Sequence, residues 1–193
     1  MYICVCHFLS FSAQLYRFLI FLYTHGWFTV YDCWAKASTQ CKEGVNYFVV
    51  NHNRTYDFES ERGILFAPDV TVHKTMNDPV PYDIVFHIKS GYIVAVSVVL
   101  EKVRTTYGYQ DVSKVKSGSR RIALDGKMID CFYWQLDNPI QITTGMKKII
   151  TRSKRNAFDV NGHLKQPLYL SHLESDLVVL FVSEIQKMNR YHR

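Results

Sequence analysis

The sequence predicts an α+β fold, a small and mostly antiparallel β-barrel with helical insertions and a C-terminal helix. Short apolar runs recur along the chain between turn residues, which is typical of strands. Aromatic residues, which favour strands, make up 15% of the 193 residues. Residues 174–188 instead carry apolar side chains at helical spacing, with Ser175 as a plausible N-cap, so we expect a helix there.

The strands are expected in five segments and in the start of a sixth, residues 163–173. Lys89-Ser90-Gly91 is a short turn that contains glycine, so the two runs around it form a hairpin. Asp125-Gly126 and Asp137-Asn138-Pro139 are predicted to be turns. The five segments are 45–50, 63–67, 83–88, 92–100 and 128–136, and the long connections are 51–62, 69–82, 101–127 and 141–162.

Residues 1–44 differ from the rest because they are apolar and aromatic, with few charges. They lack the positive start and the small-residue cleavage site of a secretory signal. Three interpretations stay open: a helix that dips into a membrane, a helix that packs on the domain, or an extension upstream of the true start. We favour the last two and expect the folded domain to span residues 45–190.

The chain carries a net charge of +6, which suits nucleic acid or an anionic membrane surface as a partner. It contains no uncharged apolar stretch flanked like a membrane-spanning helix, so no membrane partner is expected. Five cysteines, four of them before residue 42, form no C-x-x-C pair. Their odd number argues against a secreted disulfide framework, so we expect reduced thiols, a cytoplasmic location, and neither a metal nor a cofactor.

The basic residues gather in two of the long connections. Residues 102–127 hold seven basic residues against two acidic ones, and residues 141–166 hold six against one. Loops on a rigid barrel often carry binding residues, and basic loops with aromatics nearby fit a nucleic-acid surface. A solvated face that binds nothing explains the same charges equally well.

No phosphate-binding glycine loop, nucleophile elbow or H-E-x-x-H motif occurs, so no catalytic residues are expected. One alternative is a metal-dependent nuclease, because Pro68-Asp69 and Asp125-Gly126-Lys127 imitate a P-D…D-x-K signature. That chemistry needs two carboxylates on adjacent strands to hold a divalent metal, with the lysine beside the attacking water. Asp125 is expected in a turn, which counts against this alternative.

Four segments, read in order, resemble one family, the EVE domains. YFVVNHNRTYDFESERGILFAPD (47–69) is similar to the family's opening strand, polar turn, acidic helix and G-x-L-W-A-P strand. YDIVFHIKSGYIVAVSVVLEK (82–102) resembles its G-D-x-V-F hairpin. MIDCFYWQLDNPIQI (128–142) resembles its V-x-V-x-Y-x-x-L-x-x-P-I strand, and NAFDVNGHLKQPLYLSHLESDLVVLF (156–181) its F-x-x-N-G ending.

The resemblance implies a PUA-like barrel related to the YTH readers of N6-methyladenine, and a pocket that accepts a flipped, modified base. It implies a binding module without catalysis, on DNA rather than RNA, of the kind found in modification-dependent restriction and defence systems. A nuclease on another chain would be the partner. An RNA-binding PUA-like protein, or a reader of modified RNA, remains the first alternative.

By the resemblance, the family's pocket tryptophan falls on Phe66, which can stack with less area. A second aromatic comes from the loop after the hairpin, and the polar turn after the first strand touches the base. The predicted pocket residues are Phe66, Tyr107, Tyr109, Asn51, His52 and Asn53. The predicted phosphate-contacting residues are Arg120, Arg121, Arg152, Lys154, Arg155 and Lys165.

Each of these residues also has a plain structural explanation. Phe66 could be an ordinary core residue, and Tyr107 and Tyr109 could anchor their loop. The segment from Asn51 to Asn53 could cap a helix over residues 54–61. His87, in the middle of a strand, is expected to be packed rather than a ligand.

Overall fold

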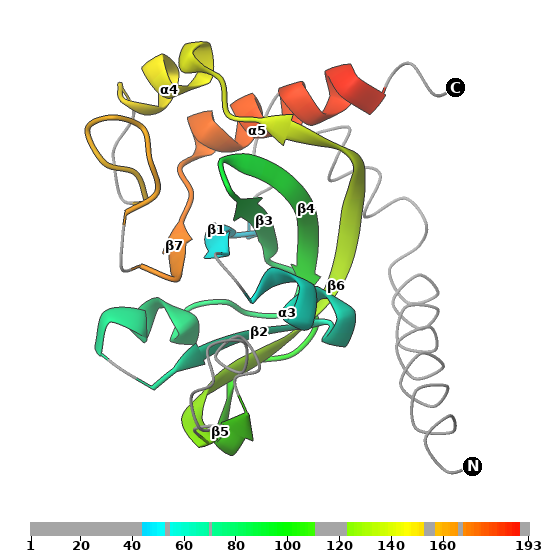
Figure 1. Ribbon diagram of the computed structural model, residues 1–193, viewed down its shortest axis with the longest axis vertical. Coiled ribbons are helices and arrows are strands. Elements are labelled where there is room, and N and C mark those ends of the chain that lie inside the picture. Colours follow the sequence, from blue (N-terminus) through cyan, green and yellow to red (C-terminus); the bar gives the residue numbers. More distant parts are fainter. Residues whose placement is uncertain are drawn as a thin grey trace, which may run out of the picture.

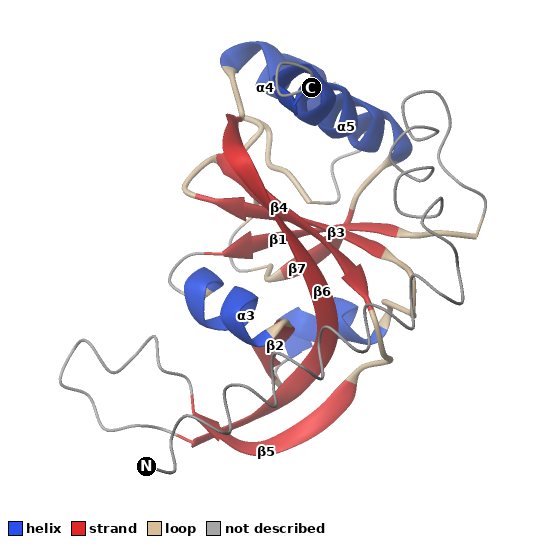
Figure 2. Ribbon diagram, turned by 90° about the vertical axis from the view of Figure 1, so that its right-hand side faces the viewer, coloured by secondary structure: helices blue, strands red, loops and turns tan. Residues whose placement is uncertain are grey.

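The chain folds around one strongly curved sheet (Figures 1 and 2). The computed structural model describes residues 44–52, 55–69, 71–110, 123–152, 157–165 and 168–189. The strands are β1 Tyr47–His52, β2 Ile64–Pro68, β3 Ile84–Lys89, β4 Tyr92–Val99, β5 Arg104–Gln110, β6 Ala123–Gln141 and β7 Leu170–His172. The helices are α3 Tyr56–Arg62, the 3-10 helix η1 Thr71–Asn77, α4 Thr144–Ile150 and α5 Ser175–Asn189.

The strands follow the order β2-β6-β4-β3-β1-β7, and β5 also pairs with β6. All of these pairs are antiparallel except β1 with β3. The helices α4 and α5 lie on one side of the sheet, whereas α3 lies inside its curl (Figure 2). The predicted α+β fold, with a curled and mostly antiparallel sheet, helical insertions and a C-terminal helix, is therefore confirmed.

The turn of the β3–β4 hairpin is the one that the sequence predicts. Ser90 and Gly91 both have positive φ, 53° and 82°, as a tight two-residue hairpin turn requires. The register pairs Lys89 with Tyr92, directly on either side of the turn. Glycine adopts such a φ without strain, which is why this dipeptide ends β3 so sharply.

Strand β6 is much longer than predicted, and two predicted turns lie within it. Asp125-Gly126 pairs with β2 and β5 through Gly126, opposite Pro68 and Thr106. Asp137-Asn138-Pro139 lies in a bulge, because Ala95 pairs with Gln135 but Ile93 pairs with Ile140. Both turn predictions are wrong, since the polar residues bend the strand without ending it.

The sequence also predicted a loop over residues 101–127. This prediction is wrong, because β5 and the start of β6 pair antiparallel with each other. Residues 111–122, between these two strands in the sequence, lie outside the described residues. The predicted strand in 163–173 shrinks to the three residues of β7. The N-terminal segment up to residue 43 is also outside the described part, so the predicted domain boundary stays a prediction.

Both faces of the central strands are buried, because the chain covers the sheet from two sides. Alternate residues of β1, such as Val49, face the helix-side core, which includes Phe86 and Phe181. The intervening residues, such as Val50, face the barrel core with Leu65. Among the described residues, no helix is long and apolar enough to cross a membrane.

Candidate functional site

A row of polar and aromatic side chains continues the barrel core toward one end of the curled sheet. On β1 the buried positions run from Val50 to His52, and on β3 they run from Val85 to His87. On β6, Cys131 is followed by Tyr133 on the same face. Because every second residue of a strand faces the same side, these polar rings point into the barrel core, which elsewhere is filled with aliphatic side chains.

We call this group the imidazole cluster, consisting of His52, Tyr56, His87, Tyr133 and Tyr169. The imidazoles of His52 and His87 stack, with ring centroids 5.0 Å apart and planes at 12°. Tyr133 tilts against His87 at 4.4 Å, and Tyr169 stands edge-on to His52 at 6.0 Å. The five rings come from β1, α3, β3, β6 and the segment before β7.

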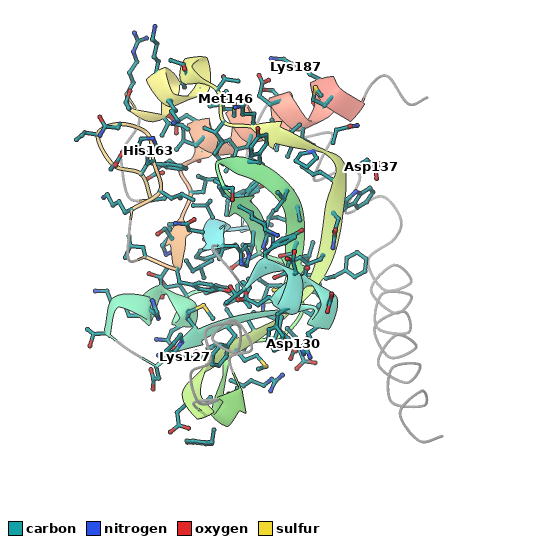
Figure 3. The ribbon with its side chains drawn as sticks, in the orientation of Figure 1. Lys127, Asp130, Asp137, Met146, His163 and Lys187 are labelled. Carbon is teal, nitrogen blue, oxygen red and sulfur yellow. The ribbon has the colours of Figure 1, made fainter. Side chains whose placement is uncertain are left out.

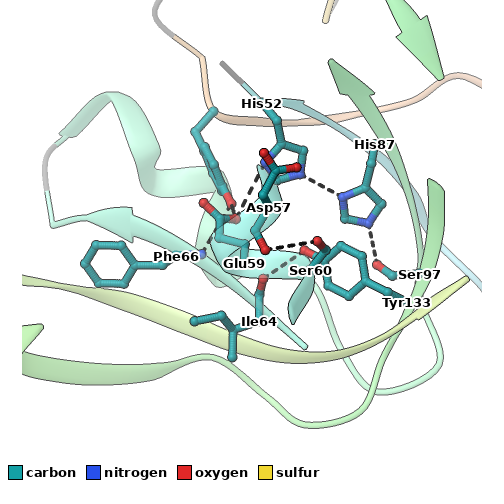
Figure 4. Close-up of polar contacts among 10 residues, drawn as sticks. His52, Asp57, Glu59, Ser60, Ile64, Phe66, His87, Ser97 and Tyr133 are labelled. Atoms are coloured by element: carbon teal, nitrogen blue, oxygen red, sulfur yellow. Dashed lines mark hydrogen bonds and ion pairs between the residues drawn. The ribbon is translucent and has the colours of Figure 1, made fainter. Parts of the chain in front are cut away.

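A hydrogen-bonded chain runs through the two histidines (Figure 4). His87 Nε2 lies 2.7 Å from Ser97 Oγ, and His87 Nδ1 lies 2.8 Å from His52 Nε2. All three side chains are inaccessible to solvent or nearly so. Because they stand on adjacent strands β4, β3 and β1, the sheet itself holds the chain in place.

Both imidazoles are held in the neutral form. Burial, with a smaller contribution from the Lys89 ammonium, lowers the pKa of His52 to about 3. Burial and the neighbouring His52 lower the pKa of His87 well below its usual value. A neutral imidazole has one N–H donor and one acceptor nitrogen, so the hydrogen bonds along the chain must all point the same way.

Glu59 of α3 bounds the cluster opposite His87. The Tyr169 hydroxyl donates a hydrogen bond to Glu59 Oε2 and accepts one from the backbone N–H of Phe66 at 3.3 Å. His52 Nδ1 lies 3.7 Å from the same Glu59 oxygen. A carboxylate oxygen at that distance favours the tautomer of His52 that carries its proton on Nδ1.

Two buried polar atoms of the cluster have no hydrogen-bond partner among the described residues. They are His52 Nδ1 and the hydroxyl of Tyr56, and these residues are 0% and 6% exposed. Burying a polar group without a partner costs about 1–3 kcal/mol, so such atoms are uncommon in folded proteins. Burial also raises the pKa of Tyr56 to about 12, so its hydroxyl remains a donor at neutral pH.

Charged residues surround Tyr56 on the outer side. The Lys89 ammonium lies 5.1 Å from the centre of the Tyr56 ring and 2.8 Å from Asp57 Oδ1. Lys89 is the next alternate residue after His87 on β3. The row of buried side chains on β3 thus ends in a half-exposed ammonium beside the cluster.

Of the predicted pocket residues, the structure brings His52 into the cluster and places Phe66, Asn51 and Tyr107 elsewhere. Phe66 is buried against Ile64 and Met128, and its ring points away from the two imidazoles (Figure 4). Asn51 is half-buried, and its backbone N–H donates to the Tyr169 carbonyl at 3.0 Å. Tyr107 is 81% exposed on β5.

Two of the predicted pocket residues are not placed: Asn53 and the side chain of Tyr109 lie outside the described residues. Asn51 and His52 belong to β1 and not to the predicted polar turn. The predicted capping role does not occur at Asn51, because the helix begins after Thr55.

Two of the predicted phosphate-contacting residues are described. Arg152 is exposed just after α4, and Lys165 is half-buried with its backbone N–H bonded to the Ala157 carbonyl. Lys147 of α4 adds a further ammonium, 3.0 Å from His163 Nε2. Figure 3 shows His163 on the same side of the molecule as α4. Arg120, Arg121, Lys154 and Arg155 lie outside the described residues.

The three residues of the nuclease alternative do lie near one another. The Asp69 N–H donates to the Asp125 carbonyl at 3.2 Å, and Lys127 Nζ lies 3.5 Å from Asp69 Oδ1. Asp125 is in a strand, so the objection that it sits in a turn is removed. In the described part of the chain, however, no group of three or more His, Cys, Asp or Glu could hold a metal ion.

Sequence reasoning missed four members of the cluster: Tyr56, His87, Tyr133 and Tyr169. His87 is confirmed as a packed strand residue, but its partners are not evident from its surroundings in the sequence. The available signal was the period of two, because His52 and His87 each continue the buried face of an apolar strand. Tyr56 gives no such signal, since it lies in a short helix within a connection.

No protein-family model matches this chain, and no curated protein matches it. Among solved structures, human THYN1 in complex with DNA containing 5-methylcytosine is similar at 8% identity, covering 73% of this chain and 98% of that one, with a TM-score of 0.45. The YTH domain of Zygosaccharomyces rouxii MRB1, in complex with N6-methyladenosine RNA, is similar at 10% identity over 75% and 88%, with a TM-score of 0.45.

The N-terminal domain of Staphylothermus marinus McrB is similar at 12% identity over 75% of this chain and 95% of that one, with a TM-score of 0.46. At such scores and identities, the function of this chain has to be argued from its own residues.

Proposed function

We propose that this chain is a nucleic-acid-binding module that recognises a modified base, in DNA rather than RNA, by taking the flipped base into the imidazole cluster. The observation that carries the proposal is His52 Nδ1, a buried polar atom without a hydrogen-bond partner among the described residues, next to the stacked imidazoles of His52 and His87. A nucleobase has a flat face for such rings and a polar edge for such an atom. Both needs of the cluster are met by one kind of ligand.

The rings supply the sequence-tolerant part of the affinity. Stacking a base on an aromatic side chain contributes about 1–3 kcal/mol. The stacked His52 and His87 are fixed by Ser97, so they offer a flat surface that loses little entropy on binding. The polar edge is read by His52 Nδ1, which the Glu59 carboxylate favours as an N–H donor.

The basic surface supplies the part of the affinity that depends on salt. The net charge of +6 favours a polyanion, and Arg152 and Lys165 are proposed to contact phosphates. The same role is proposed for Arg120, Arg121, Lys154 and Arg155. Such contacts position the nucleic acid but do not identify its modification.

The module is proposed to work without catalysis of its own, as the recognition part of a restriction or defence system in the cytoplasm. Cleavage would come from a nuclease on another chain. The cluster supports a module that binds without catalysing, because its two imidazoles are hydrogen-bonded and neutral, with pKa values far below the usual value. They are placed to hold a ring rather than to exchange protons at neutral pH.

A panel of fluorescent duplexes tests the proposal. It contains unmodified DNA and DNA with N6-methyladenine, 5-methylcytosine or 5-hydroxymethylcytosine, each at two salt concentrations. We expect a preference of about tenfold for one modified duplex that persists at higher salt, because a neutral site is not screened. Equal and salt-sensitive binding to all four would contradict the proposal, and competition with matched RNA separates the RNA alternative.

Two variants locate the site. His52→Gln keeps a hydrogen-bonding group of similar size but removes the ring and Nδ1, so the preference for the modified duplex should fall about tenfold. Tyr107→Ala removes a predicted pocket residue that is exposed on β5, and it should leave the preference unchanged. If Tyr107→Ala lowers the preference and His52→Gln does not, the base site lies where the sequence resemblance predicts it.

A further inference from the structure

We propose that Tyr56 closes the base site as a gate: its ring covers the stacked imidazoles in the free protein and must move outward to admit a base. This inference rests on the proposed function and adds to it a residue that competes with the base for the same rings. The first turn of α3, Tyr56 and Asp57, is the part that moves.

The position of Tyr56 supports the gate. Its ring stands edge-on to His52 at 5.2 Å and lies 6.3 Å from His87, so it contacts both members of the stack. Its other side faces the Lys89 ammonium beside the exposed Asp57. Tyr56 therefore separates the imidazole pair from the charged outer edge, along the line that a base would follow.

The first turn of α3 is held weakly. The helix has only seven residues, and its N-cap Thr55 makes no side-chain hydrogen bond to it. On the outside, the Lys89–Asp57 pair is 33% and 74% exposed, and ion pairs at such positions contribute little. On its outer side, Tyr56 is therefore held by weak polar contacts, and its firmer contacts are those of its ring with the two imidazoles.

The second turn of α3 is held firmly and can serve as the pivot. Glu59 is buried and accepts the hydrogen bond of Tyr169. Gly63 ends the helix in the left-handed region, with φ of 64°, and its N–H caps the last turn. The gate is therefore a local opening of one turn next to a fixed turn, not a movement of the whole helix.

The Tyr56 hydroxyl biases the gate toward opening. In the closed state it is buried without a partner, and on opening it regains hydrogen bonds with water. Tyr56→Phe removes this advantage, so the closed state should gain population. Because binding needs the open state, the association rate should fall in proportion to that population.

Two measurements test the gate. The first is hydrogen exchange of the Glu59 amide in the free protein, because that amide bonds to the Thr55 carbonyl at 2.9 Å across the first turn. The second is the association rate with the preferred modified duplex. Tyr56→Phe should slow both by about fivefold or more, and Tyr56→Ala should speed association. Tyr92→Phe, which removes a hydroxyl from a more exposed tyrosine, is the control and should change neither.

Unchanged exchange of the Glu59 amide in Tyr56→Phe would overturn the gate whatever the duplexes show. An unchanged association rate, in a chain that does prefer one modified duplex, would overturn the gate and leave the proposed function intact. A chain without any such preference would overturn the proposed function, and the exchange rates would then decide on the gate alone.

Discussion

At the scale of single residues, the two buried histidines tie the site to the stability of the fold. His52 and His87 are neutral in the folded protein because burial lowers their pKa values. In the unfolded chain they regain an ordinary pKa near 6.5. Below that pH the unfolded state binds protons that the folded state does not, so acid favours unfolding.

We therefore expect the free energy of unfolding to fall as the pH is lowered from about 6.5 toward 3. Each buried imidazole should contribute a slope of about 1.4 kcal/mol per pH unit. Chemical denaturation between pH 7 and pH 5 measures this slope. His52→Gln should reduce the slope by the contribution of one imidazole, about 1.4 kcal/mol per pH unit. The control is His163→Gln, which removes an exposed imidazole. An equal slope in His52→Gln and the native chain would contradict the assignment of His52 as neutral.

Some of these residues could be predicted from the sequence and others could not. His52 was predicted as a site residue by the family resemblance, in which the polar turn after the first strand touches the base. Tyr169 could not be predicted, because only the fold brings it beside Glu59, which is 110 positions earlier in the chain. Phe66 was predicted to line the base pocket. Successive side chains of β2 face opposite sides, however, so the Phe66 ring lies on the opposite face from Leu65.

At the scale of elements, the contact between β2 and β6 depends on one glycine. A Cβ atom at Gly126 would lie 2.5 Å from the Phe66 ring and 2.6 Å from the Ala67 carbonyl oxygen. The Phe66 ring thus packs on the backbone of β6, which is the structural role of both residues. This contact also explains why a glycine here belongs to a strand and not to a turn.

Gly126→Ala should destabilise the protein by about 1–3 kcal/mol, because neither the ring nor the carbonyl can give way fully. Gly145→Ala is the matched control, since its nearest neighbour would be 3.7 Å away and it lies in α4, where alanine is favoured. Thermal or chemical denaturation measures both. If Phe66→Leu does not partly rescue Gly126→Ala, the clash is with the backbone of β2 rather than with the ring.

The elements themselves were predicted unevenly, for physical reasons. The β3–β4 hairpin was predicted because its turn chemistry is local, with Ser90-Gly91 between two apolar strands. The length of β6 was missed because a bulge accommodates Asp137-Asn138-Pro139, and pairing partners on β4 continue the strand beyond it. Long-range pairing overrides local turn residues, and a single sequence does not display its pairing.

At the scale of the whole molecule, the curled sheet turns separate strands into one site. The hydrogen bonds from Ser97 through His87 to His52 require β4, β3 and β1 side by side, in this register. A shift of either pairing by one residue would move a histidine to the opposite face. The basic residues proposed to contact phosphates need less precise placement, because charge–charge attraction acts over longer distances than a hydrogen bond.

The most direct test of the central claim is the imidazole NMR signals of His52 and His87, recorded with and without the preferred modified oligonucleotide. We predict that both sets of signals shift when the modified strand binds and stay in place with the unmodified strand, while those of the half-exposed His172 on β7 change with neither. Saturating, modification-dependent binding without any change at His52 and His87 would show that the base is read elsewhere.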